Sequence, residues 1–197
     1  MKNTSLTLML FLICFTAFSQ SRIHSNFGIK AGATTAKFGQ EHINWDTKYR
    51  WHAGLIAHLH ISDHFAIQPE LFYSAQGSEH VIVGSDRQIE LGYLQLPVLF
   101  QYMTGSGFRF QGGPQIGLLM SARQQINGGT KADVKDSFKK TDFSLTAGIS
   151  YITRMGLGFD ARYSYGLSDI SDTDNTAGTD INNLLIQVGV FYQFKLK

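Results

Sequence analysis

Five charged side chains occupy the polar positions of stretches in which apolar and polar residues alternate: Lys30, Glu70, Arg109, Asp160 and Arg162. Successive side chains of a β-strand point to opposite faces, so all five are expected on the face opposite the apolar one. Two carboxylates and three cations in a crowded, poorly solvated space should pair, because an unpaired buried charge is costly. The sequence therefore predicts an ion-pair network, and the alternative is a proton-linked or ion-conducting path along the same side chains.

Three histidines, His52, His58 and His60, share this polar parity within one stretch. A His-x-His pair such as His58 and His60 can hold zinc or copper, with a further ligand from a neighbouring strand such as Glu70. The alternative, which we favour, is that the histidines fill polar space and are hydrogen-bonded there. We therefore expect no metal and no cofactor.

Catalytic motifs are absent from the sequence. It contains no Gly-x-Ser-x-Gly motif and no paired-glycine phosphate loop. His42, His64 and His80 are expected in loops or turns, and no serine is placed by its spacing as their partner. We expect that the protein is not an enzyme.

The N-terminal residues predict export. A short basic start is followed by an apolar run over residues 6–18 and by small residues at Ala17 and Ser19, which is typical of a secretory signal peptide. The run is shorter than the ~20 residues that a spanning helix needs. We expect a cleaved signal peptide over residues 1–19 and one domain over residues 20–197. The single cysteine, Cys14, lies in the signal peptide, so the mature chain can form no disulfide or thiolate site.

Eight stretches alternate at period two, the signature of β-strands with one apolar face. Short connections at residues 62–64, 104–106 and 154–155 alternate with long polar ones at 39–48, 76–88, 123–141 and 168–182. This alternation is typical of a transmembrane barrel with short periplasmic turns and long extracellular loops. We predict an all-β, eight-stranded antiparallel up-and-down barrel with both termini on the periplasmic side. The predicted strands are 27–38, 49–61, 65–75, 89–103, 107–122, 142–153, 156–167 and 183–194.

A soluble eight-stranded barrel of the lipocalin kind is the alternative, because eight strands are common to both classes. The polar face decides between them: it holds glycines, glutamines and isolated charges, which suit a crowded interior better than a surface in water. The formal net charge of only +2 gives no sign of the basic surface that binds nucleic acid. The last stretch ends in Phe194, with Tyr192 two residues and Gly189 five residues earlier, and resembles the signal by which outer-membrane barrels are recognised for insertion.

Short motifs along the whole mature chain resemble the small outer-membrane β-barrel family typical of the Bacteroidetes, the porin-family or PorT-like proteins. The resemblance implies an outer-membrane barrel in a Gram-negative envelope. A PorT-like role in protein secretion does not follow from the fold alone. The matching stretches are residues 27–32 (FGIKAG), 67–73 (IQPELFY), 91–99 (LGYLQLPVL), 111–114 (QGGP) and 147–149 (AGI).

The functional expectation is a structural or interaction role through the loops. Side chains fill the interior of an eight-stranded barrel, so the lumen should be plugged. Residues 128–140 are mixed in charge and residues 169–180 are acidic; Asp172-x-Asp174 lacks the glycine and distal glutamate of a calcium loop. The expected partners are outer-membrane lipid, lipopolysaccharide, the barrel-insertion machinery and an unidentified extracellular or envelope protein, with the chain itself a monomer. The alternatives are narrow porin-like transport of ions or small solutes, or a PorT-like accessory role in secretion.

Overall fold

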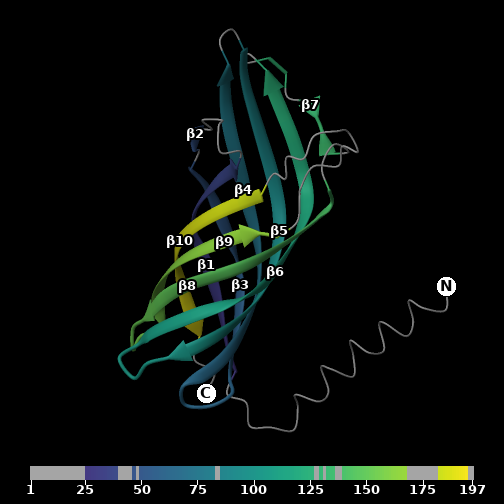
Figure 1. The fold of residues 1–197 in the computed structure, drawn as a ribbon. Helices are drawn as coiled ribbons and strands as arrows, with labels where there is room; N and C mark the ends of the chain where they lie inside the picture. Colours follow the sequence, from purple (N-terminus) through teal and green to yellow (C-terminus); the bar gives the residue numbers. More distant parts are fainter. Residues whose placement is uncertain are drawn as a thin grey trace, which may run out of the picture.

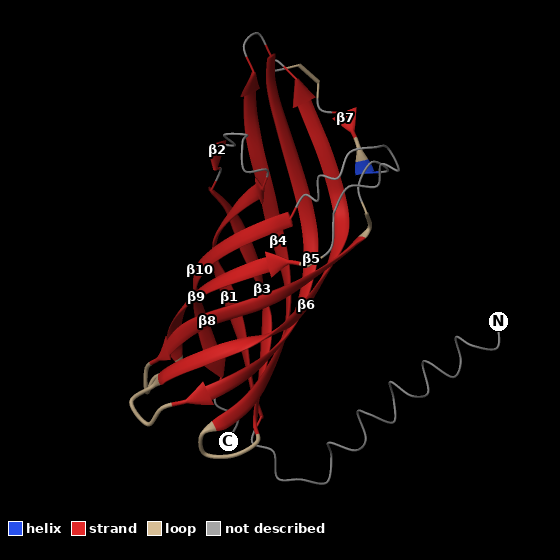
Figure 2. Cartoon of the chain, viewed as in Figure 1, coloured by secondary structure: helices blue, strands red, loops and turns tan. Residues whose placement is uncertain are grey.

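The computed structural model describes residues 25–39, 46–47, 49–82, 85–126, 129–130, 132–135, 139–167 and 182–194. The predicted signal peptide and its cleavage site lie outside these residues, so the boundary at residue 19 stays a prediction. The described chain is almost entirely β-strand (Figure 2). The strands are β1 Ser25–Gly39, β2 Asp46–Thr47, β3 Tyr49–His60, β4 Phe65–Ile82, β5 Ser85–Met103, β6 Phe108–Ile126, β7 Ala132–Asp133, β8 Thr141–Ile152, β9 Leu157–Gly166 and β10 Asn182–Phe194.

The eight long strands close into an antiparallel up-and-down barrel, which confirms the predicted fold (Figure 1). Each long strand pairs with the next along the chain, and β1 pairs with β10 from Phe27↔Phe194 to Gly39↔Asn182 to complete the ring. The two-residue strands β2 and β7 attach to β4 and β6 outside this ring. None of the described residues belongs to a helix long and apolar enough to cross a membrane.

Side chains alternate across the barrel wall as the period-two pattern predicts. Apolar side chains point outward and are exposed, for example Leu55 at 58% and Leu145 at 52%. Polar side chains such as Gln68, Gln101 and Gln187 are buried inside. A soluble lipocalin-like barrel would have the opposite arrangement, so that alternative is wrong.

One wall of the barrel is taller than the sequence predicts. Residues 76–88 are not a loop: β4 continues to Ile82 and β5 starts at Ser85, and the two strands stay paired up to Ile82↔Ser85. β6 likewise runs on to Ile126, within the predicted loop 123–141. The residues of these extensions are mostly polar and lack the period-two apolar pattern. A strand that extends beyond the apolar layer keeps its backbone hydrogen bonds but needs no apolar face. In Figure 1, β4, β5 and β6 rise well past the ends of β9 and β10.

The three short turns lie at the opposite end of the barrel, as predicted. Two of them have the same construction: the backbone N–H of Gly107 donates to Thr104, and that of Gly156 donates to Thr153. Gly107 (φ 97°) and Gly156 (φ 92°) adopt a left-handed conformation that favours glycine. Ser25 and Phe194, the first and last described residues, also lie at this end (Figure 1). We call it the turn side and the other end the loop side.

Candidate functional site

Four of the five predicted charged residues meet in the middle of the lumen. Lys30 comes from β1, Glu70 from β4, and Asp160 and Arg162 from β9. All four are buried. The Arg162 guanidinium contacts both carboxylates, with Nη1 2.6 Å from Glu70 Oε2 and Nε 2.7 Å from Asp160 Oδ2. Lys30 Nζ lies 3.1 Å from Glu70 Oε2 and 3.6 Å from Asp160 Oδ2.

Glu70 is the centre of this cluster. Its carboxylate accepts two hydrogen bonds from Arg162, at 2.6 and 2.7 Å, in the bidentate geometry that makes guanidinium–carboxylate pairs strong. It also accepts one from Lys30 Nζ at 3.1 Å and one from Gln68 Nε2 at 2.7 Å. The Lys30 ammonium also lies 4.7 Å from the ring centroid of Phe72. Two positive and two negative charges thus balance in a space closed to solvent.

Glycines on the inner face make room for these long side chains. Gly148 lies opposite Arg162 in the β8–β9 register, and a Cβ there would come within 2.9 Å of the Arg162 Cγ. Gly189 lies opposite Asp160, and a Cβ there would come within 3.1 Å of its Oδ1. At these two positions a larger residue would crowd both the backbone of the neighbouring strand and the charged side chain beside it.

Arg109 does not join this cluster, which corrects the prediction of a five-residue network. It lies near the turn-side start of β6, opposite Met103 and Ser150. Its Nη2 donates to Gln193 Oε1 at 3.2 Å, and no carboxylate of the described residues forms an ion pair with it. Strand parity places Arg109 inside the barrel, but Ser150 on β8 lies between it and Asp160 in the pairing register, and its side chain bonds to Gln193 instead.

His52 and His58 are buried, hydrogen-bonded lumen residues. His52 Nδ1 lies 2.9 Å from Thr34 Oγ1, and His58 Nδ1 lies 3.2 Å from Gln68 Oε1. The His58 and His60 rings meet edge to face with centroids 4.5 Å apart. Within the described part of the chain, no three His, Cys, Asp or Glu residues are grouped so that they could hold a metal ion.

An apolar cluster that the alternating pattern did not predict lies toward the loop-side end of the lumen. Its core consists of buried side chains on β5, β6 and β10, and its outer part includes Val134 just after β7. A register shift between Gly92 and Tyr93 contributes, because Leu119 and Ala122 both turn inward on β6. The available signal was the presence of large apolar residues at inward parity, such as Tyr93 and Leu185. The buried members are Leu91, Tyr93, Leu119, Ala122 and Leu185.

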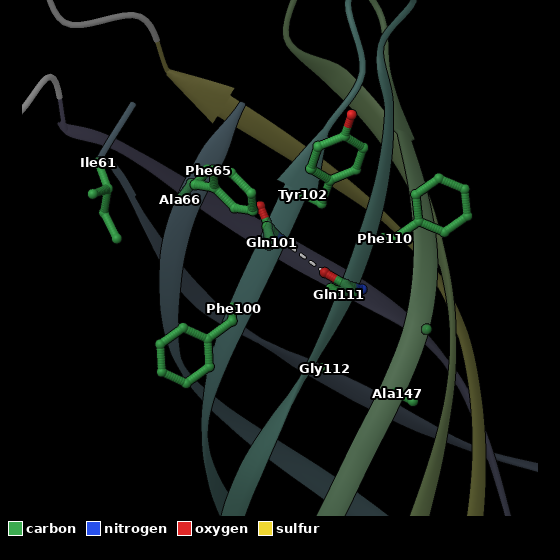
Figure 3. Close-up of a pocket in the computed structure, with 11 residues that line it drawn as sticks. Ile61, Phe65, Ala66, Phe100, Gln101, Tyr102, Phe110, Gln111, Gly112 and Ala147 are labelled. Carbon is green, nitrogen blue, oxygen red and sulfur yellow. Dashed lines mark hydrogen bonds between the residues drawn. The ribbon is translucent and has the colours of Figure 1, made fainter. Parts of the chain in front are cut away.

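The outer surface carries an apolar groove near the turn side, with a volume of about 650 Å³. Figure 3 shows Phe100, Tyr102 and Phe110 around Gly112 and Ala147, where small residues hollow the wall. Behind it, Gln101 Nε2 donates to Gln111 Oε1 at 2.7 Å. Apart from Gln101 and Gln111 its lining is apolar, aromatic or small, so the groove offers a mainly apolar contact surface.

The residues of the predicted insertion signal lie on β10. Tyr192 and Phe194 point outward, and their rings lie 5.2 Å apart. Gly189 lies on the inner side, next to Asp160. This placement puts the two aromatic rings on the outer surface beside the turn-side end, and their role in insertion stays a prediction.

Comparison with known proteins identifies a family and a fold. Residues 18–172 match the sequence profile of the outer membrane protein beta-barrel domain. No curated protein matches the chain. The crystal structure of Neisserial surface protein A is similar, with a TM-score of 0.52 and 15% identity over 87% of this chain and 97% of that one. Ail, the attachment invasion locus protein of Yersinia pestis, crystallised with the heparin analogue sucrose octasulfate, gives a TM-score of 0.50 and 15% identity over 88% and 100%.

Proposed function

The chain belongs to the outer membrane protein beta-barrel domain family, and we propose that it is a non-conducting barrel that binds a partner through its loop side. It is an outer-membrane β-barrel protein, and the proposal concerns what this barrel does there. We place the loop side outside the cell and the turn side in the periplasm, the usual orientation of such barrels. The chain acts as a monomer embedded in outer-membrane lipid and lipopolysaccharide.

The observation that carries the proposal is the tall wall of β4, β5 and β6. These strands have 18, 19 and 19 residues, whereas β8 and β9 have 12 and 10. An apolar band of ~25 Å is crossed by about ten tilted residues, so the wall is several residues longer than the membrane requires. A paired sheet is a more rigid platform for a partner than a loop of the same length.

Two features of the lumen support the absence of conduction. The ion-paired cluster of Lys30, Glu70, Asp160 and Arg162 lies across its middle, and the apolar cluster around Tyr93 and Leu185 lies at its loop-side end. Eight-stranded barrels have interiors that side chains fill. An ion on this path would have to displace a buried bidentate ion pair and then cross an apolar layer.

The names of the two similar structures fit a surface role, since one is a surface protein and the other an attachment protein. At 15% identity they share the fold with this chain. The resemblance to Bacteroidetes-type, PorT-like barrels stays a prediction. A PorT-like accessory role would need a partner at the periplasmic turns instead.

Narrow transport is the second candidate, because several polar side-chain atoms inside the barrel have no hydrogen-bond partner in the protein. They include both amide atoms of Gln95 and the Oγ of Ser150. Water can satisfy such atoms and could form a thin path. Conductance separates the two candidates.

The test of conduction is planar-bilayer recording of the refolded barrel. We expect no steady conductance from the wild type. The triple variant Glu70→Ala/Arg162→Ala/Tyr93→Ala should show a conductance that increases with salt concentration. The matched control Arg50→Ala/Glu90→Ala removes an ion pair that is partly exposed and should stay silent. A steady wild-type conductance proportional to salt would favour transport.

The test of the binding surface is photo-crosslinking in intact cells. A crosslinking side chain at Arg123, exposed on the tall wall, should capture a partner, and one at Met155 in a turn should not. Capture at Met155 alone would place the partner in the periplasm and favour the accessory role. Equal labelling at both positions would contradict a dedicated loop-side surface.

A further inference from the structure

Arg109 is a buried cation without a counter-charge. Its residue is 7% exposed, its Nη2 donates to Gln193 Oε1 at 3.2 Å, and its Nη1 has no hydrogen-bond partner. The other two lumen cations, Lys30 and Arg162, are balanced by Glu70 and Asp160. The remaining buried carboxylate, Asp142, lies near the loop-side start of β8, so Arg109 at the turn-side end has no ion-pair partner among the described residues. Burying a charge without a partner is costly, so something should neutralise it.

Further donors without partners surround this guanidinium. Ser150 lies directly opposite Arg109 in the β6–β8 register, and Gln111 lies two residues further along the same inner face of β6. Ser150 Oγ and Gln111 Nε2 both lack a hydrogen-bond partner. Directly opposed residues of an antiparallel pair have Cβ atoms about 5 Å apart, so the Ser150 hydroxyl lies beside the Arg109 side chain, and Gln111 is the next inward residue along β6.

A chain of hydrogen bonds holds the Arg109 side chain in place. Gln193 accepts from Arg109, and its Nε2 donates to Gln68 Oε1 at 3.4 Å. The same Gln68 oxygen lies 3.2 Å from His58 Nδ1, and Gln68 Nε2 donates to Glu70 at 2.7 Å. The guanidinium is thus oriented by neutral amides, which leave its charge uncompensated.

The turn side offers few carboxylates that could supply the missing charge. Asp63 is the only acidic residue of the three turns; it is exposed and forms no ion pair among the described residues. Asp160 lies directly opposite Ser150 in the β8–β9 register. Its carboxylate forms ion pairs with Arg162 and Lys30.

We propose that Arg109 is the centre of a binding site for a small inorganic anion of the halide class at the periplasmic mouth of the lumen. The guanidinium Nη1, Ser150 Oγ and Gln111 Nε2 donate to the ion, which neutralises the remaining buried charge. A small ion fits best, because Gln111 is also tied to Gln101 at 2.7 Å and the inner face is crowded there. This site is independent of any partner on the loop side.

The first test is bromide, an anomalous scatterer, soaked into crystals of the full barrel. We expect an anomalous peak within hydrogen-bond distance of Arg109 Nη1. A map without such a peak, or a crystal structure in which Arg109 pairs directly with Asp160, would overturn the proposal. Because this test uses the wild-type chain, it does not depend on how any variant folds.

The second test is ³⁵Cl line broadening of the detergent-solubilised barrel. The wild type should broaden the chloride signal, and Arg109→Gln should lose that excess broadening. The matched control is Arg154→Gln, which removes an exposed turn-side cation and should leave the broadening unchanged. Added bromide should displace chloride, whereas stronger displacement by phosphate would contradict the halide assignment. Equal broadening by the wild type and Arg109→Gln would show that Arg109 binds no anion.

Discussion

Glu70 is the residue on which the charge balance of the lumen depends, because its carboxylate accepts hydrogen bonds from Arg162, Lys30 and Gln68. Glu70→Gln removes the negative charge and leaves Asp160 facing two cations. Removing one partner of a buried ion pair typically costs 3–5 kcal/mol, so we expect a loss of about that size. The measurement is urea unfolding of the barrel refolded into lipid vesicles, followed by its shift in gel mobility.

Glu90→Gln is the matched control. Glu90 pairs with Arg50 at 2.9 Å, but the two side chains are 26% and 29% exposed. Solvent screens such a pair, so the loss should stay at or below about 1 kcal/mol. Equal losses for the two variants would mean that the central cluster is no more important than a pair at the rim.

The seam between β1 and β10 is tight enough to require glycine. A Cβ at Gly32 would meet the Val188 carbonyl oxygen and would approach His52 Cε1 to 2.7 Å. Gly32→Ala should therefore cost about 1–3 kcal/mol through overpacking. Gly105→Ala is the control, because a Cβ in that turn meets nothing within 4 Å. Unfolding in vesicles tests both, and an unaffected Gly32→Ala barrel would show that the seam can open without cost.

The outer face of β5 tests the apolar layer. Leu96 points outward near the middle of the strand, and Leu96→Arg should cost about 2–4 kcal/mol in bilayers if it faces hydrocarbon. Thr130→Arg is the control, because Thr130 is exposed beyond the loop-side end of β6. A silent Leu96→Arg variant that folds without detergent or lipid would contradict a membrane-facing wall.

The orientation of the whole barrel predicts which trypsin sites are accessible on intact cells. Lys135 and Lys139 lie on the loop side, and Arg154 lies in a turn. Trypsin added outside should cut after Lys135 or Lys139 and leave the bond after Arg154 intact. Permeabilising the outer membrane should then expose Arg154. Mass spectrometry of the new N-termini reads the result, and cleavage after Arg154 in intact cells would reverse the assigned orientation.

Strand parity, and with it the division between inner and outer residues, was determined by the sequence. A period of two follows from backbone geometry alone, so the sequence pattern is enough to place Lys30, Glu70, Asp160 and Arg162 inside the barrel, where all four are buried. The eight strands and the short turns follow from the same alternating pattern. Closure into a barrel follows because only a closed sheet leaves no unpaired edge in hydrocarbon.

Which of the inward side chains meet, in contrast, was decided by the tertiary structure. Closure of the barrel brings Arg162 of β9 across the lumen to Glu70 of β4 and leaves Arg109 beside Gln193, although both arginines have the same parity. The register also carries β4 and β5 up to Ile82↔Ser85 through polar residues that resemble a loop in sequence. Pairing between strands depends on backbone hydrogen bonds made far apart in the chain, and these bonds leave little trace in the side-chain pattern of any single strand.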